Sequence, residues 1–180
     1  MKHAIVCSAI LMAMLGLAAI PTHAQTPTPP LRQMGEMHKA APPSGPLVIT
    51  FGDKSATWTP AALAGQPHVT IAVHNEHTKA DETYSGVPLI ALLTPLGLSD
   101  KPRGKDLRLY VVAEGSDGYE VVYSIGEIAP DIHDATVIVA DAENGKPLAA
   151  DGPLKLVASG EKRPARWVRN LVAIKVLAAE

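Results

Sequence analysis

Cysteine is almost absent from this chain of 180 residues, and its single cysteine, Cys7, lies close to the N-terminus. Everything after Cys7 therefore lacks a nucleophilic Cys–His pair and has no means of forming a disulfide. Aromatic residues are also scarce, at 4% of the sequence. Leucine, valine, isoleucine and alanine must therefore fill the core.

The sequence also has no strong excess of charge of either sign. Charged residues make up 19% of the chain, hydrophobic residues 47%, and the formal net charge is −2. A nucleic-acid-binding protein normally has a basic footprint, and a disordered chain has lower hydrophobicity or higher net charge. We therefore expect a globular domain that does not bind nucleic acid, and the length predicts one domain.

A long apolar run occurs only at the N-terminus, between Ala4 and Ile20 after the basic residue Lys2. Small residues at Thr22 and Ala24 then mark a cleavage site of the kind found in secretory signal peptides. The run is shorter than the roughly 18 residues that usually span a membrane. We therefore predict a signal peptide over residues 1–24, with cleavage after Ala24.

No pair of arginines precedes this run, which favours the general secretory route over the twin-arginine route. The expected location is periplasmic or secreted, and the cleaved chain is expected to have no membrane-spanning segment. Residues 25–46 contain many prolines and are predicted to form a flexible linker. Met34, Met37 and His38 in this linker are copper ligands by type, but the favoured interpretation is an incidental occurrence in a flexible tail, because the ligands are few.

Strand-like runs dominate the remaining residues, 47–180, which are predicted to form the folded domain. They occur at residues 47–51, 69–73, 107–112, 119–123, 136–140, 154–157 and 167–177. Short helices are expected after Thr59 and from Pro88 to Leu96, and a tight turn at Gly115–Gly118 joins two strands into a hairpin. The fold class is therefore predicted to be α+β, a β-rich mixed domain with a few short helices.

Two histidines, His74 and His77, are separated by two residues in a polar stretch predicted to be an exposed loop. An H-x-x-H pair can bind zinc or copper if a third ligand joins it, and the candidates are Glu76, Asp81 and His133. Surface histidines in polar loops are nevertheless commoner than metal ligands.

Other catalytic patterns are absent, since Ser85 is not in a G-x-S-x-G turn and no phosphate-binding glycine loop occurs. A basic cluster at Lys162, Arg163, Arg166 and Arg169 is more suggestive. Guanidinium groups bind phosphate or carboxylate in a two-point geometry, so an anionic ligand is one interpretation. A solvated, charged loop is the alternative.

An ordered series of short motifs carries a resemblance to a known family. The motifs are Tyr84–Leu89, Ser116–Tyr119, Asn144–Leu148, Gly152–Val157 and Arg163–Arg169. This series, within Leu47 to Leu177, resembles the oxidoreductase molybdopterin-binding domain that sulfite oxidase shares with its bacterial periplasmic relatives. The resemblance implies a mixed α+β fold of the sulfite-oxidase type. The residues that it implies near the cofactor are Ser85, Gly86, Asp117, Tyr119, Arg163, Arg166 and Arg169.

The chain departs from this family in two respects. Catalytic members ligate molybdenum through a cysteine that the resemblance places near residues 74–83, where this chain has none. A general secretory signal would also export the chain unfolded and without cofactor, whereas such enzymes are loaded in the cytoplasm. Both departures indicate that no molybdenum cofactor is bound.

The leading hypothesis is therefore an exported, non-catalytic binding or accessory module for a small anionic ligand or for a periplasmic redox or membrane partner protein. One alternative is an enzyme, a molybdopterin-dependent oxidoreductase of the sulfite or sulfoxide type that lacks the cysteine ligand. Another is a periplasmic copper- or zinc-binding protein that uses His74 and His77.

Overall fold

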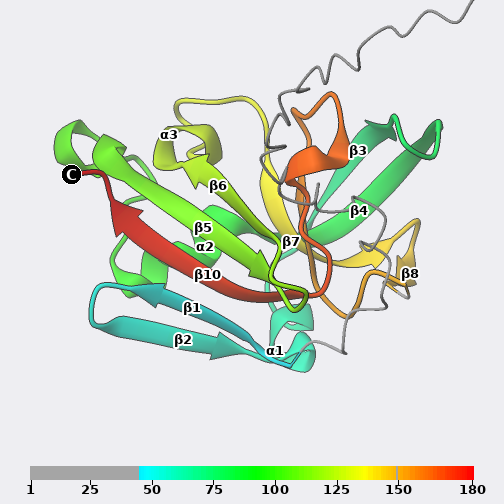
Figure 1. Cartoon of the computed structure of the whole chain (residues 1–180), viewed down its shortest axis with the longest axis horizontal. Helices are drawn as coiled ribbons and strands as arrows, with labels where there is room; N and C mark the ends of the chain where they lie inside the picture. The colour runs from blue at the N-terminus through cyan, green and yellow to red at the C-terminus, as the bar shows by residue number, and fades with distance from the viewer. Residues whose placement is uncertain (1–44, 149) are drawn as a thin grey trace, which may run out of the picture. The chain divides into compact units, whose positions relative to one another are not determined.

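The computed structural model describes residues 45–148 and 150–180, and Figure 1 shows them as a coloured ribbon. The predicted signal peptide, most of the predicted linker and the candidate copper ligands Met34, Met37 and His38 lie outside the described residues. Within the described part, no helix is long and apolar enough to cross a membrane.

The first of two five-stranded sheets joins the beginning of the domain to its end (Figure 1). Its strands lie in the order β2 (Lys54–Trp58), β1 (Leu47–Phe51), β10 (Leu171–Ala178), β5 (Leu109–Gly115) and β6 (Glu120–Ser124). β1 and β10 pair in parallel, and the other neighbours are antiparallel.

The second sheet is antiparallel throughout. It contains β3 (Val69–Asn75), β4 (Ala80–Pro88), β7 (Val137–Glu143) and β8 (Lys146–Pro147), and β9 (Lys155–Ala158) also pairs with β7. The predicted turn at Gly115–Gly118 is confirmed, because it connects β5 with β6.

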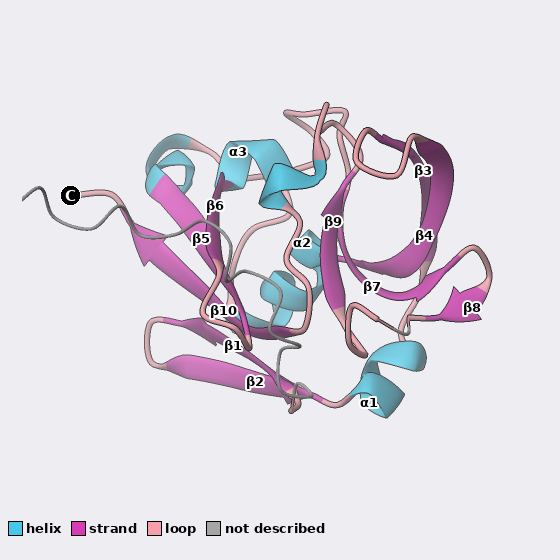
Figure 2. Cartoon of the chain, turned by 45° about the vertical axis from the view of Figure 1, so that its right-hand side comes forward, coloured by secondary structure: helices cyan, strands magenta, loops and turns pink. Residues whose placement is uncertain are grey.

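The helices are few and short (Figure 2), as the sequence predicts. They are α1 (Pro60–Ala64), α2 (Leu89–Leu93), α3 (Ile125–Ile128) and three 3₁₀ turns, η1 (Thr94–Leu96), η2 (Gly104–Arg108) and η3 (Pro164–Arg166). Thr59 caps α1, because its hydroxyl accepts the Ala62 N–H at 3.1 Å. Gly97, at φ 104°, ends the helical segment that begins after Pro88.

Both sheets and α2 contribute to one main buried cluster, while a smaller cluster covers the other face of the second sheet. β7 is buried on both faces, as its nearly continuous apolar sequence predicts. Val137 and Val139 face the main cluster, whereas Ile138 and Ala140 face the smaller one. The β-rich α+β class is therefore confirmed.

Several predicted boundaries are wrong; residues 107 and 108, expected in a strand, belong to η2, and two further differences bear on the site. Residues 80–82, expected in a polar loop, begin strand β4. The charged Glu82 lies on the buried face of this strand, so the usual alternation of apolar and polar residues is missing there. Trp167, expected to begin the last strand, precedes β10 and is buried in the smaller cluster, where its indole N–H donates to the Ala158 carbonyl at 3.2 Å.

Candidate functional site

The β5–β6 hairpin and η3 bring together several of the residues predicted from the sequence. The Asp117 carboxylate accepts the Tyr119 N–H at 3.0 Å, which closes the turn between the strands. The Tyr119 hydroxyl donates to the Ala165 carbonyl, and the Tyr123 hydroxyl donates to the Arg166 carbonyl at 2.9 Å. The hairpin therefore holds η3, and Asp117 and Tyr119 have local structural roles.

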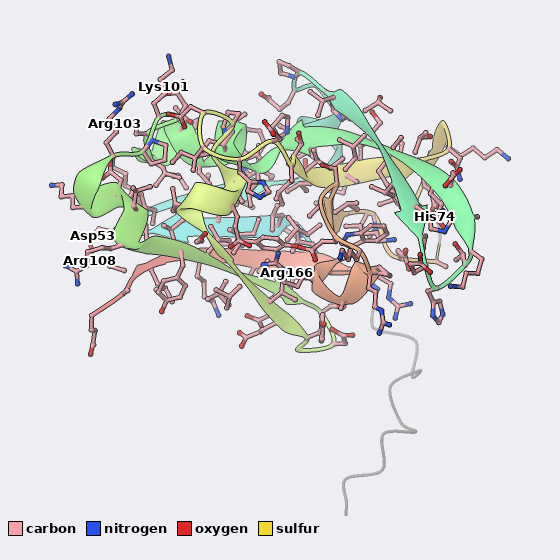
Figure 3. All side chains as sticks on the ribbon, turned by 90° about the horizontal axis from the view of Figure 1, so that it is seen from above. Asp53, His74, Lys101, Arg103, Arg108 and Arg166 are labelled. Atoms are coloured by element: carbon pink, nitrogen blue, oxygen red, sulfur yellow. The ribbon has the colours of Figure 1, made fainter. Side chains whose placement is uncertain are left out.

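Arg166 lies at the centre of this region (Figure 3). Its Nε donates to Glu161 at 2.9 Å, Nη2 donates to the same carboxylate, and Nη1 donates to Glu127 at 2.9 Å. The guanidinium also lies over the Tyr123 ring, 4.4 Å from its centroid. The arginine therefore binds two carboxylates of its own chain.

The charges of this group stabilise one another. Burial opposes the charged form of Arg166, but the hydrogen bonds to Glu161 and Glu127 outweigh it and raise the pKa of the guanidinium. Burial likewise opposes ionisation of Glu127, yet hydrogen bonds from Ser124 and Arg166 lower the pKa of its carboxyl. Arg166 is therefore not free to clamp an external anion in the way that the sequence predicts.

A small cavity of about 130 Å³ opens beside this group, where the two sheets meet. Its polar lining comes from Tyr123, Glu127, His133, Glu161 and Arg166. The His133 Nδ1 accepts the Ala135 N–H at 3.1 Å, which leaves Nε2 as the protonated nitrogen of the neutral ring. Two carboxylates face one guanidinium here, so the cavity has no surplus of positive charge.

The other predicted arginines lie on the surface. The side chain of Arg169 is 60% exposed, and its Nη1 lies 3.7 Å from Asp151. Arg163 is exposed as well, and its charge acts on Glu76 in the turn between β3 and β4. A hydrogen bond from Lys79 is the main cause that lowers the pKa of the Glu76 carboxyl. Arg163 and Arg169 are therefore the exposed arginines of the predicted cluster.

Ser85 and Gly86 lie in the second sheet, at a bulge between β4 and β7. A Cβ atom on Gly86 would lie 2.2 Å from the Val139 carbonyl oxygen. Among the described residues, no hydrogen bond or ion pair joins Ser85 or Gly86 to the arginines. Gly86 therefore serves the close approach of two strands, and the predicted groove does not unite these residues with the basic cluster.

His74 lies in β3, away from Arg166 (Figure 3), and His77 lies in the turn that follows this strand. The His74 Nδ1 is 2.7 Å from Asp81, while its Nε2 is 3.9 Å from Glu76. Across residues 45–148 and 150–180, no group of three or more His, Cys, Asp or Glu side chains is placed to hold a metal. His133, considered as a third ligand, lines the cavity beside Arg166 instead.

Sequence reasoning missed a buried polar group on the face of the second sheet that the smaller cluster covers. The Tyr84 hydroxyl donates to Glu82 at 2.8 Å and accepts from Lys155 at 3.0 Å, and Lys155 also donates to Asp151 at 2.7 Å. Burial opposes ionisation of Glu82, but hydrogen bonds from Asn75, Thr78 and Tyr84 outweigh it and lower the pKa of the carboxyl. The spacing of Glu82, Tyr84 and Gly86, two residues apart, was the sequence signal that they share one face of a strand.

Comparison with solved structures identifies the fold. The chain aligns with sulfane dehydrogenase SoxCD from Paracoccus pantotrophus at a TM-score of 0.56, with 22% identity, over 73% of this chain and 37% of that chain. The domain is similar in fold to part of that chain. It spans little more than a third of that chain, so the similarity concerns architecture alone.

The sequence comparisons do not show a family. No protein-family profile matches the chain. A stretch of 82 residues is 33% identical to the DNA primase small subunit PriS of Thermoplasma volcanium, which covers 46% of this chain and 23% of that protein. The chain thus spans about a quarter of this relative.

The residues present do not fit molybdopterin in the way that the resemblance places it. Cys7, the single cysteine, lies outside the described domain, so the domain offers no thiolate to molybdenum. Arg166 is bound to two carboxylates, Gly86 is packed against β7, and the cavity of about 130 Å³ is smaller than ligand pockets of roughly 300–1,000 Å³.

Proposed function

We propose that this protein is an exported, non-catalytic binding or accessory module built on the fold of a molybdopterin-binding oxidoreductase domain. The observation that carries the proposal is the engagement of Arg166 by Glu127 and Glu161, in a domain without a thiol. The group expected to hold an anionic cofactor binds the chain's own carboxylates instead. The shared fold with a dehydrogenase chain and the predicted signal peptide support the architecture and the location.

The binding surface that we propose contains the exposed cations beside η3, namely Lys162, Arg163 and Arg169. Exposed guanidinium groups can bind a small oxyanion or the carboxylates of a partner protein. A periplasmic redox protein or the outer part of a membrane complex would fit, because the domain shares its fold with a redox enzyme chain.

The first test is the metal and pterin content of the native protein. The full chain with its own signal would be produced in its host, purified from the periplasm and assayed for molybdenum, copper, zinc and released pterin. We expect molybdenum and pterin far below stoichiometric amounts. Stoichiometric molybdenum with pterin would overturn the proposal and favour an oxidoreductase, whereas copper or zinc alone would favour a metal-binding protein that uses His74 and His77.

The second test concerns the anion-binding surface. The double variant Arg163→Ala/Arg169→Ala should weaken the affinity for inorganic phosphate or sulfate at least about tenfold in calorimetric titrations, because both exposed guanidinium groups are lost. The matched control is Lys101→Ala/Arg103→Ala, which removes two exposed cations that lie away from Arg166 (Figure 3). An equal loss in both variants, or no binding by the native protein, would contradict the assignment of this surface.

A further inference from the structure

We infer that a network formed by Asn75, Glu82, Tyr84, Asp151 and Lys155 locks the β3–β4 hairpin to β9 and the loop before it, independently of any cofactor. We call it the hairpin network. It lies on the hairpin where the resemblance places the metal-ligating cysteine, so the inference rests on the proposed function. It goes further, because it assigns to these side chains the role of holding that segment.

The hydrogen bonds of the hairpin network have a defined direction. Lys155 can only donate, and it donates to Asp151 at 2.7 Å and to the Tyr84 hydroxyl at 3.0 Å. The Tyr84 proton must therefore be directed to Glu82, which accepts it at 2.8 Å. This chain of bonds connects β9 and the loop before it with β4.

Glu82 extends the network to the turn of the hairpin. Its carboxylate accepts two contacts from the Asn75 amide, at 2.9 and 3.0 Å, and the Thr78 hydroxyl at 2.7 Å. The side-chain Oδ1 of Asn75 in turn accepts the His77 N–H at 3.0 Å. With the bond from Tyr84, the four lone-pair sites of the carboxylate are used, so Glu82 has no site left for a metal.

The network contains two carboxylates and one ammonium group, and the exposed Arg169, 3.7 Å from Asp151, supplies a second positive charge beside it. Glu82 and Lys155 are both buried, and a buried charge is costly unless it is paired and hydrogen-bonded. Asp151 pairs with Lys155, and the rings of Tyr84 and Trp167 lie 4.6 and 5.1 Å from the ammonium group. The buried polar side chains of the hairpin therefore find their hydrogen-bond partners within the chain.

The experiment compares Tyr84→Phe and Lys155→Met with the control Lys175→Met, which removes an exposed lysine paired with Glu114 in the other sheet. All proteins would be made in a host that cannot synthesise molybdopterin. We expect the native chain to fold there with the same Tm as protein from a host that makes the cofactor. Lys155→Met should lower the Tm by about 10 °C, and Lys175→Met by no more than about 2 °C.

If Lys155→Met does not fold, the milder variant Tyr84→Phe still tests the inference. Removal of one hydroxyl should accelerate amide hydrogen exchange at His77 and Thr78 at least about tenfold. Glu82 loses a hydrogen bond, and the Asn75 side chain that it holds accepts both amide N–H groups. Unchanged exchange and a Tm equal to that of the control would overturn the inference. So would a native chain that is unfolded when made without the cofactor.

The outcomes separate this inference from the proposed function. Stoichiometric molybdenum in native protein, together with faster exchange in Tyr84→Phe, would overturn the function and support the structural role of the network. A metal-free protein whose hairpin exchanges at the same rate in Tyr84→Phe would support the function and overturn the network.

Discussion

Gly86 lies at the bulge where β4 pairs with β7, and its missing side chain sets the distance between these strands. A Cβ atom there would meet the Val139 carbonyl oxygen at 2.2 Å and the Ala140 Cα at 2.5 Å, both of them backbone atoms that cannot rotate away. The bulge would have to open to accommodate any side chain, and the buried face of β7 would separate from β4.

The change Gly86→Ala should therefore destabilise the domain by about 3 kcal/mol or prevent folding, as overpacking of a buried position does. Gly65→Ala is the matched control, because a Cβ atom at Gly65 has ordinary contacts, the nearest at 3.6 Å. Urea unfolding of both variants measures the difference. Similar midpoints for the two variants would contradict this account of Gly86.

His68 shows a second single-residue constraint, since both ring nitrogens face acceptors. Nδ1 lies 2.6 Å from the Gln66 carbonyl oxygen, and Nε2 lies 3.0 Å from Asp141. The ring can donate to both only when it is protonated. The hydrogen bond to Asp141 is the largest cause that raises the pKa of His68, the bond to Gln66 adds to it, and burial opposes both.

A raised folded-state pKa means that this contribution to stability is fully present below the unfolded value of about 6.5 and is lost as the pH rises through the folded value. The difference in Tm between the native protein and His68→Gln should therefore be largest near about pH 5.5 and shrink towards about pH 8.5. Asp141→Asn, which removes the charged acceptor, should abolish the trend. A difference that does not vary with pH would contradict the assignment.

At the scale of elements, α3 has four residues and depends on its first turn for stability. The Ser124 hydroxyl accepts the Glu127 N–H at 3.3 Å, and the Glu127 carboxylate accepts the Ser124 N–H at 2.8 Å, which forms a capping box. Glu127 also binds Arg166, so the cap and the cavity share one carboxylate.

Ser124→Ala should lower the free energy of unfolding by about 1 kcal/mol, because the first turn loses its side-chain acceptor. Ser55→Ala, at an exposed position in β2, should change it by less than about 0.5 kcal/mol. Chemical denaturation of the two variants gives both values. An equal effect would show that the cap contributes nothing measurable.

The elements that sequence patterns predict well are those with local signals. The β5–β6 hairpin has its turn residues between two strand-like runs, and α1 begins where Thr59 and Pro60 indicate. β4 lacks such a signal because Glu82, a charged residue, lies on its buried face. Glu82 is tolerated there only because Asn75, Thr78 and Tyr84 donate to it.

At the scale of the whole domain, the last strand occupies the centre of the first sheet. β10 lies between β1, from the start of the domain, and β5. Its inward residues Leu171, Ile174 and Val176 belong to the main buried cluster. Folding therefore requires residues that are far apart in the sequence to pair.

A chain that ends at Asn170 should consequently show no cooperative unfolding transition, because the first sheet loses its central strand and the core loses one wall. Removal of Glu180 alone, beyond the end of β10, should leave the Tm within about 1 °C of the native value. Differential scanning calorimetry distinguishes these cases. A cooperative transition in the shorter chain would contradict the central role of β10.

The arginine cluster shows where prediction of the site from sequence fails. Its four basic residues are recognisable in the sequence, but Arg166 binds Glu127, which is 39 positions away. That carboxylate is placed by α3 and β6, whose position depends on the pairing of β6 with β5. The exposed positions of Arg163 and Arg169 likewise depend on how η3 is held against the hairpin.

The sequence by itself determined the absence of a thiol in the domain, the mild net charge, the tight turns, the short helices and the buried strand β7. These properties belong to covalent composition or to backbone preferences within a few residues. Only the tertiary structure decided that Arg166 is neutralised, that Gly86 is a packing residue and that a polar network joins the β3–β4 hairpin to β9. The physical reason is that the neighbours of a charged side chain determine whether it can bind a ligand. These neighbours are set by strand pairing between segments that are far apart in the sequence.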